Sequence, residues 1–169
     1  MKITKSTIKQ YLKEIIYLII TMTIVANLMS IYRSQSLNDA PLAIKSFQLI
    51  NHNNYNIDNT KPLLIHFWAT WCPTCKMEAS NIDFLSKHYQ VVTIAVKSGS
   101  DAEIQNYLHE HNYNYKVVND IDGSLSRKFQ IAGYPTTFIY DKEGKLRFSE
   151  VGYTSTFGLW IRLLWAKFK

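Results

Sequence analysis

Residues 67–75 read FWATWCPTC, and this segment contains both cysteines of the 169-residue chain, Cys72 and Cys75. It begins within a continuous apolar run, Leu63–Trp68, which is typical of a β-strand buried on both faces. The segment that follows, Pro73–His88, has the apolar spacing of a helix, and proline is well tolerated in the first turn of a helix. The two cysteines are therefore expected at a strand-to-helix junction.

This position has chemical consequences for Cys72. Backbone N–H groups without partners and the positive end of the helix dipole both stabilise a thiolate at a helix N-terminus. Thiolate is the nucleophile of disulfide exchange, so Cys72 is expected to be accessible and to react first. Cys75 is expected to be the more buried thiol, whose attack on a mixed disulfide at Cys72 releases the substrate. Metal sites use the same C-x-x-C spacing, but two cysteines cannot form a four-thiolate zinc site.

The rest of the chain alternates between predicted strands and predicted helices, and it contains no internal repeat. Strands are expected at residues 43–49, 63–68, 91–96, 116–118, 136–140 and 146–151, and helices at 73–88, 101–111, 124–129 and 157–168. A turn ending in Gly144 joins the last two strands as a hairpin. This order predicts an α/β domain with a central mixed sheet, flanked by helices and edged by the antiparallel hairpin.

Local patterns within these elements give more detailed expectations. Asp101 is expected to cap its helix, and His52–Asn59 is expected to be a polar turn. The side chains expected to face the core are Met77, Ile82 and Leu85 in one helix, and Phe157, Ile161, Leu164 and Phe168 in the last helix. The last helix also carries Arg162 and Lys167, so contact with a membrane surface is a second interpretation of that helix.

Three segments resemble a known family. The segment 67–75 resembles the active-site segment of the thioredoxin superfamily, in particular of its membrane-anchored, extracytoplasmic TlpA/ResA-like members. The segment 133–138, GYPTTF, resembles the cis-proline loop of that superfamily. The ending from Gly152 onward, with its Trp-rich helix, is similar to the suppressor-of-copper-sensitivity protein D group. The resemblance covers about residues 43–169, and it implies a thioredoxin-like fold and thiol–disulfide oxidoreductase activity.

The resemblance implies roles for individual residues. Cys72 and Cys75 are the catalytic residues and form a redox-active disulfide. Pro135 is expected to be cis and to lie across from Cys72, which leaves the backbone at Tyr134 able to pair with an extended substrate peptide. Trp71 is expected to form an apolar lip of the same substrate-binding surface.

Two ionisable residues lie close to the cysteines in the sequence. His66 stands six positions before Cys72, where thioredoxins commonly have an aspartate that shuttles a proton. It is a candidate for proton transfer from Cys75, and the alternative is a hydrogen-bonded core histidine. Glu78 stands six positions after Cys72, where ResA-like proteins keep an acidic residue. It is a second candidate for proton transfer, and the alternative is a solvated helix residue.

The N-terminal part of the chain differs in composition from the rest. Of 19 Lys and Arg residues, five lie in residues 1–33 beside a single acidic residue, and the other 14 face 12 acidic residues in 34–169. This near-balance argues against nucleic-acid binding. Ile15–Tyr32 contains 18 residues without a charge, a helical length of about 27 Å. This length predicts a transmembrane helix, and the lysines before it predict a cytoplasmic N-terminus.

We therefore expect three parts. Residues 1–33 are a basic N-terminus and transmembrane signal anchor, 34–42 are a linker, and 43–169 are a thioredoxin-like domain. The chain is expected in the inner membrane as a single-pass protein, with its C-terminal domain in the periplasm. A cleaved secretory signal is the alternative, although residues 27–33 offer no A-x-A-like cleavage site.

These features together predict a membrane-anchored periplasmic thiol–disulfide oxidoreductase. The resemblance implies a reductase of the cytochrome c maturation or copper tolerance type, although the direction of the reaction depends on the reduction potential of the pair and does not follow from the sequence. Its expected partners are exported proteins with cysteine pairs and a membrane thiol–disulfide reductant or oxidant that resets its own pair. No cofactor and no metal are expected. One alternative is a Cu(I)-binding or copper-delivering module that uses the same cysteines, with Met77 as the only obvious third ligand nearby. Another alternative is a redox-inert peptide-binding domain.

Overall fold

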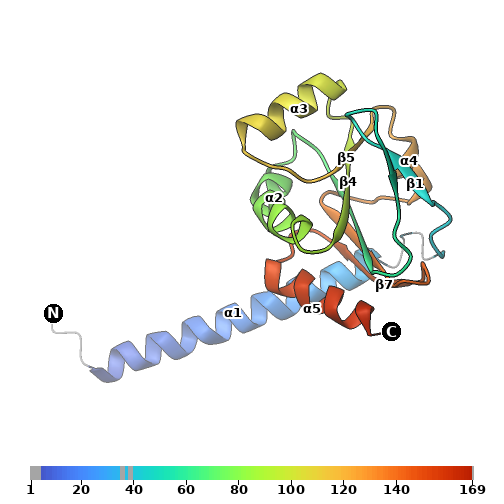
Figure 1. The fold of residues 1–169 in the computed structure, drawn as a ribbon. Helices are drawn as coiled ribbons and strands as arrows, with labels where there is room; N and C mark the ends of the chain where they lie inside the picture. The colour runs from blue at the N-terminus through green and yellow to red at the C-terminus, as the bar shows by residue number, and fades with distance from the viewer. Residues whose placement is uncertain (1–4, 35–36, 38–39, 169) are drawn as a thin grey trace.

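The computed structural model describes residues 5–34, 37 and 40–168 (Figure 1). A long helix, α1 (Lys5–Ser34), runs along the lower side of an α/β domain and projects beyond it. Residues 1–4 of the predicted basic N-terminus and residues 35–36 and 38–39 of the predicted linker lie outside the described residues. Leu37, within that linker, is buried in the core of the domain. Among the described residues, no helix combines the length and the apolar character that crossing a membrane requires.

The central sheet has five strands in the order β5-β4-β3-β6-β7. Their bounds are β3 (Leu63–Trp68), β4 (Gln90–Val96), β5 (Val117–Asp120), β6 (Thr136–Tyr140) and β7 (Leu146–Val151). The first three run parallel to one another, β6 pairs antiparallel with β3, and β7 pairs antiparallel with β6. Gly144 adopts a φ of +74° in the turn between β6 and β7. The prediction of a mixed sheet edged by the terminal hairpin is therefore confirmed.

Helices and a small hairpin cover the two faces of this sheet (Figure 1). The helices α2 (Pro73–Ser86), α3 (Asp101–Glu110) and α5 (Thr156–Lys167) pack on one face. The short helix α4 (Ser124–Lys128) and a separate two-stranded sheet, β1 (Ser46–Gln48) with β2 (Asn54–Asn56), pack on the other face. The fold is thus a thioredoxin-like α/β fold, as expected.

The strand β2 corrects the expectation that His52–Asn59 forms only a polar turn. Tyr55 pairs directly across from Phe47 of β1, and its hydroxyl donates a hydrogen bond to Gln90 in the central sheet. Tyr55 thus ties this short strand both to β1 and to the central sheet. The predicted strand 43–49 is correspondingly shortened to β1 and joins this hairpin rather than the central sheet.

The cap of α3 also differs from the expectation. Ser100, not Asp101, precedes the helix, and its hydroxyl accepts a hydrogen bond from the backbone N–H of Glu103 at 3.3 Å. The Glu103 carboxylate in turn accepts a hydrogen bond from the Ser100 N–H at 2.7 Å. This reciprocal capping box satisfies two N–H groups at the helix start. Asp101 occupies the first helical position and accepts a hydrogen bond from the side chain of Asn119 instead.

Two predicted helix faces are wrong in part. In α2, Ile82 and Leu85 are buried as expected, but Met77 is 68% exposed. In α5, the core-facing side chains are Leu159, Leu163 and Ala166, whereas Phe157, Ile161 and Phe168 are exposed. The sequence of α5 is apolar on both faces, so its periodicity does not determine which stripe packs inward. The stripe with smaller side chains fits against α2 and β6.

Candidate active site

Cys72 and Cys75 form a disulfide at the start of α2, with their Cα atoms 5.3 Å apart. Cys72 caps the helix: its Sγ accepts a hydrogen bond from the backbone N–H of Cys75 at 3.2 Å. Cys75 is 2% exposed and Cys72 is 5% exposed, so Cys75 is the more buried residue, as expected. The expectation that Cys72 is readily accessible does not hold in this oxidised form, because the disulfide lies almost entirely below the surface.

The cis-proline loop lies beside this disulfide segment. The peptide bond between Tyr134 and Pro135 is cis, as the resemblance implied. The ring of Tyr134 packs edge-on against the ring of Trp71, with centroids 5.7 Å apart. Trp71 is 57% exposed, and its indole N–H donates to the carbonyl oxygen of Lys97 at 3.1 Å. The structure therefore brings Trp71 and Tyr134 together at one partly exposed surface next to Cys72, whereas Pro135 itself is buried.

Glu78 is fully buried, which excludes the alternative of a solvated helix residue. Its Oε1 accepts a hydrogen bond from the backbone N–H of Thr154 at 3.3 Å, and its Oε2 has no hydrogen-bond partner within the described residues. Burial raises the pKa of this carboxyl to about 8; the Thr154 N–H opposes the shift, and the charge of Glu150 adds to it. Glu78 follows Cys75 by three residues on the buried face of α2. The Glu78 carboxyl, whose pKa is close to that of an ordinary thiol, thus lies one helical turn after Cys75.

His66 lies within β3 and is buried. Its Nδ1 is 2.9 Å from the hydroxyl oxygen of Thr137 on the neighbouring strand β6. Burial lowers the pKa of the imidazole to about 3, so the ring is neutral at neutral pH. Such a ring is a weak proton acceptor. These contacts favour the alternative of a hydrogen-bonded core histidine.

The loop after β7 is a part of the site that the sequence did not assign. The Gly152 N–H donates to the carbonyl oxygen of Pro135 at 2.8 Å. The side-chain amide of Asn81, on α2, donates to the carbonyl oxygen of Thr154 at 3.2 Å and to the Tyr153 hydroxyl at 3.3 Å. This loop therefore joins the cis-proline loop to α2 next to Glu78. Its residues stand out only in the family resemblance, because their partners are distant in the sequence.

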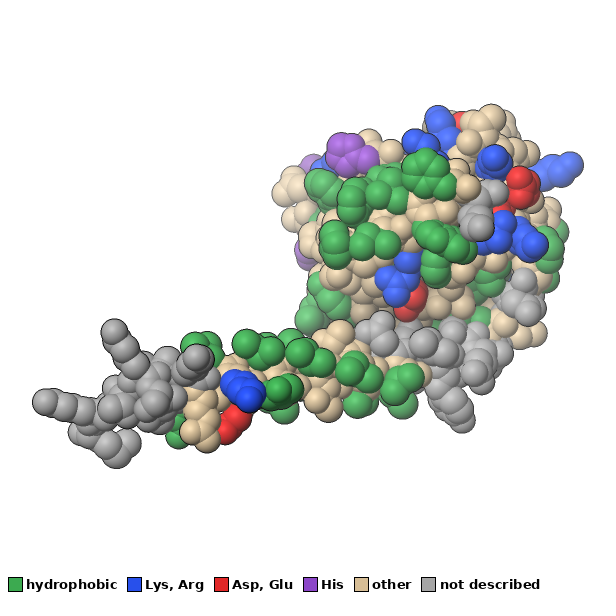
Figure 2. Space-filling model, turned by 90° about the horizontal axis from the view of Figure 1, so that it is seen from below, with side chains coloured by type: hydrophobic (Ala, Val, Ile, Leu, Met, Phe, Trp, Pro, Cys, Tyr) green, Lys and Arg blue, Asp and Glu red, His purple; other side chains and the backbone are tan. Residues whose placement is uncertain are grey.

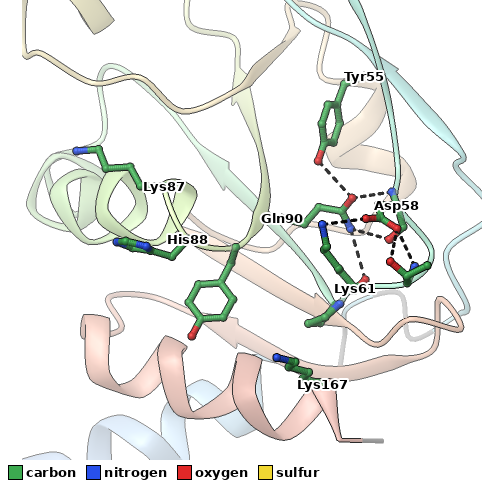
Figure 3. A pocket seen from close by; sticks show the side chains of 10 residues that line it. Tyr55, Asp58, Lys61, Lys87, His88, Gln90 and Lys167 are labelled. Carbon is green, nitrogen blue, oxygen red and sulfur yellow. Dashed lines mark hydrogen bonds and ion pairs between the residues drawn. The ribbon is translucent and has the colours of Figure 1, made fainter.

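A separate cavity of about 600 Å³ lies at the other end of the sheet, near the starts of β3 and β4 (Figure 3). Several of its polar groups are paired with one another: Lys61 lies 3.1 Å from Asp58, and Gln90 accepts hydrogen bonds from Tyr55 and from the Asp58 N–H. None of the residues predicted to act in catalysis lines this cavity. The candidate active site is therefore the surface around the disulfide rather than this cavity.

The predicted copper alternative gains no support from the site. Cu(I) prefers thiolate and thioether ligands, so binding would require the reduced cysteine pair together with a third ligand. Met77, considered as a third ligand, points its side chain to solvent at the surface of α2. Within the described part of the chain, no group of three or more His, Cys, Asp or Glu residues could hold a metal ion.

Comparisons with known proteins agree with this geometry. A sequence profile described as the AhpC/TSA family matches residues 36–149. A thioredoxin-like protein of Haemophilus influenzae is 32% identical over 164 residues, which cover 95% of this chain and 98% of that protein. The thiol–disulfide oxidoreductase ResA of Bacillus subtilis is 31% identical over 117 residues, and the match spans 64% of this chain and 63% of ResA.

A solved structure shows the same fold. The exposed lipoprotein thioredoxin of Streptococcus pneumoniae superposes with a TM-score of 0.63 at 25% identity, covering 74% of this chain and 98% of that chain. Together with the Cys72–Cys75 disulfide and the cis peptide bond at Pro135, these matches establish the family. The chain belongs to the AhpC/TSA family and is a thioredoxin-like thiol–disulfide oxidoreductase.

Proposed function

We propose that this protein is a membrane-anchored periplasmic reductase, which transfers electrons from Cys72 and Cys75 to disulfides of exported proteins. The proposal rests on one observation above all. The disulfide caps the N-terminus of α2 and lies beside the loop of Pro135, which contacts the cysteine segment through Trp71. A helix N-terminus stabilises the thiolate that forms when this disulfide is reduced.

In the reduced protein, the Cys72 thiolate attacks one sulfur of a substrate disulfide. The substrate S–S bond breaks, one substrate cysteine leaves as a thiolate that takes up a proton, and a mixed disulfide remains on Cys72. Cys75 then loses its proton and attacks the Sγ of Cys72, which expels the second substrate cysteine. The substrate gains two electrons, and the products are a substrate dithiol and the Cys72–Cys75 disulfide seen in the structure. A dithiol of a membrane reductant returns the pair to its reduced state.

Glu78 is the proton carrier in this proposal. Its pKa of about 8 lies close to that of an ordinary thiol, about 8.5, so transfer of a proton between Cys75 and the carboxylate costs little free energy. Both residues belong to the buried face of α2, where water has little access. We assign no proton transfer to His66, because its neutral ring is a weak acceptor.

Substrate binding is proposed for the surface formed by Trp71 and Tyr134, next to the buried Pro135. The exposed Trp71 ring offers apolar area to residues next to a substrate cysteine. An extended substrate segment can pair with the backbone at Tyr134 as an added strand.

Membrane anchoring is proposed for residues 1–33, with a linker at 34–42 and the catalytic domain at 43–169. The exposed apolar side chains of α1 support it, because the six consecutive residues Ile15–Ile20 are all exposed. Six consecutive helical residues cover every side of the helix, so no single packing partner within the domain would bury them. Lipid surrounds such a helix on all sides.

The reduction potential of the Cys72–Cys75 pair tests the direction of the reaction. A reductase is expected to have a potential more negative than about −200 mV, and an oxidase one less negative than about −150 mV. A Cys75→Ser variant expressed in cells should retain its substrates as mixed disulfides on Cys72. Trapped apocytochromes would assign the protein to cytochrome c maturation, and trapped copper-handling proteins would assign it to copper tolerance. An oxidising potential together with no trapped protein would contradict the proposal.

A further inference from the structure

The outer face of α5 is apolar and exposed. Five large side chains lie on it: Phe157, Trp160, Ile161, Trp165 and Phe168. Phe168 is 83% exposed and Phe157 is 66% exposed, which is unusual for aromatic residues of a globular domain. This outer face is distinct from the inner stripe of Leu159, Leu163 and Ala166, which packs into the core.

The outer face of α5 is held in place by its contacts with β7. Trp165 packs edge-on against Phe148, with ring centroids 5.4 Å apart. Arg162 lies 2.7 Å from the Glu150 carboxylate and its guanidinium carbon is 5.9 Å from the centre of the Phe148 ring. Ser155 caps the helix start by accepting a hydrogen bond from the Gly158 N–H. The exposed rings thus belong to a fixed surface rather than to a frayed terminus.

The same side of the molecule carries α1. Seen from below, hydrophobic side chains over α5 lie beside the hydrophobic side chains of α1 (Figure 2). These exposed fractions of the α5 side chains are the ones that remain with α1 present. The apolar face of α5 and the apolar helix α1 therefore lie on the same side of the molecule.

The connection between α1 and the domain is short. α1 ends at Ser34, and Leu37 is already buried in the core. Three residues of extended chain span at most about 11 Å. A bilayer that holds α1 therefore also lies close to the domain, and the domain must turn some face toward it.

We propose that the outer face of α5 inserts into the boundary between headgroups and acyl chains of the same membrane that holds α1. This inference rests on the anchoring proposed above. Trp and Phe side chains favour this boundary. α5 begins directly after the loop that binds Glu78, so its insertion fixes the height of the disulfide above the membrane. Substrates attached to or emerging from the same membrane would then be favoured.

Tryptophan fluorescence in nanodiscs tests this proposal with the full-length chain. The four tryptophans are Trp68, Trp71, Trp160 and Trp165, and none lies in α1, so their emission reports only on the domain. Lipids with brominated acyl chains quench tryptophan that enters the acyl boundary. We expect brominated lipid to quench the wild-type protein and the matched control Trp71→Phe, and to leave the double variant Trp160→Phe/Trp165→Phe unquenched. Phenylalanine keeps the surface apolar, so this loss reports the position of the two rings.

Co-purification of the chain with the nanodisc separates this inference from the anchoring. A chain that incorporates but shows no bromine quenching of Trp160 and Trp165 would overturn the α5 inference and leave the anchoring intact. If the two rings are buried only in nanodiscs that hold two chains, the outer face of α5 contacts a second copy of the chain instead of lipid. This result would also overturn the α5 inference. A chain that does not incorporate would overturn both proposals.

Discussion

The backbone N–H of Thr154 donates a hydrogen bond to Oε1 of Glu78 at 3.3 Å, between residues 76 positions apart in the sequence. The same loop binds Pro135 through the N–H of Gly152. The buried carboxyl, the loop after β7 and the cis-proline loop therefore form one connected unit next to the Cys72–Cys75 disulfide. A change in the charge of Glu78 therefore acts directly on its hydrogen bond with Thr154, which belongs to this unit.

The first prediction concerns the pH dependence of catalysis. Glu78→Gln removes the proposed proton carrier, so the release of substrate from the mixed disulfide should slow by at least about tenfold, as expected for loss of a general acid–base. The wild-type rate should show an inflection near pH 8, and the variant should lose it. Stopped-flow measurement of mixed-disulfide resolution between pH 6 and 9 checks this. His66→Gln, which keeps a hydrogen-bonding group near Thr137, is the matched control and should retain the inflection.

The second prediction concerns stability. Folding raises the pKa of Glu78 from its ordinary value of 4.5 to about 8, so the folded protein holds a proton that the unfolded chain releases. The stabilisation is complete below pH 4.5 and is lost as the pH rises through 8. Between these values, the free energy of unfolding should fall by up to about 1.4 kcal/mol per pH unit more steeply in the wild type than in Glu78→Gln. Denaturant titrations of the oxidised protein at pH 5 to 8 measure both slopes, and equal slopes would show that the carboxyl is not buried.

The third prediction concerns substrate binding. Trp71→Ala removes an exposed ring next to Cys72, so kcat/KM for a protein disulfide should fall about tenfold, the loss expected for an interaction of about 1.4 kcal/mol. The rate with a small disulfide such as oxidised glutathione should change little, because such a substrate does not reach the Tyr134 surface. Trp71→Phe is the conservative control. An equal loss with both substrates would mean that Trp71 positions Cys72 instead of binding substrate.

The fourth prediction concerns the capping box of α3. Ser100→Ala removes the hydroxyl that accepts the hydrogen bond of the Glu103 N–H, and it should lower the free energy of unfolding by about 1 kcal/mol. Asp101→Asn keeps a hydrogen-bonding side chain toward Asn119 and should have a smaller effect. Thermal unfolding of the two variants compares them. A larger loss in the Asp101 variant would restore Asp101 as the more important residue at this end of the helix.

Much of this fold could be predicted from the sequence, for physical reasons that single elements show. The strand β3 has the predicted bounds, because an apolar run buried on both faces is bounded by Pro62 and by the residues before Cys72. The hairpin of β6 and β7 also has the predicted bounds, because Gly144 supplies the turn with a positive φ. The cysteine pair was predicted for the same reason: its position depends only on local strand and helix patterns.

Other features depend on contacts between distant residues and did not follow from local patterns. Which stripe of α5 packs inward is decided by its fit against α2 and the sheet, and both stripes of its sequence are apolar. The burial of Glu78 depends on the loop around Thr154, more than 70 residues later in the chain. The strand β2 depends on the pairing of Tyr55 with Phe47 across the hairpin.

Reaction of the reduced full-length protein with a peptide disulfide tests most directly that Cys72 is the attacking sulfur. Mass spectrometry would locate the peptide adduct in Cys75→Ser and in Cys72→Ser. We expect Cys75→Ser to accumulate an adduct on Cys72, and Cys72→Ser to react at least about 100-fold more slowly, because Cys75 lacks the position at the helix N-terminus that stabilises a thiolate. Rapid adduct formation on Cys75 in the Cys72→Ser variant, or the absence of an adduct on Cys72 in the Cys75→Ser variant, would contradict this assignment.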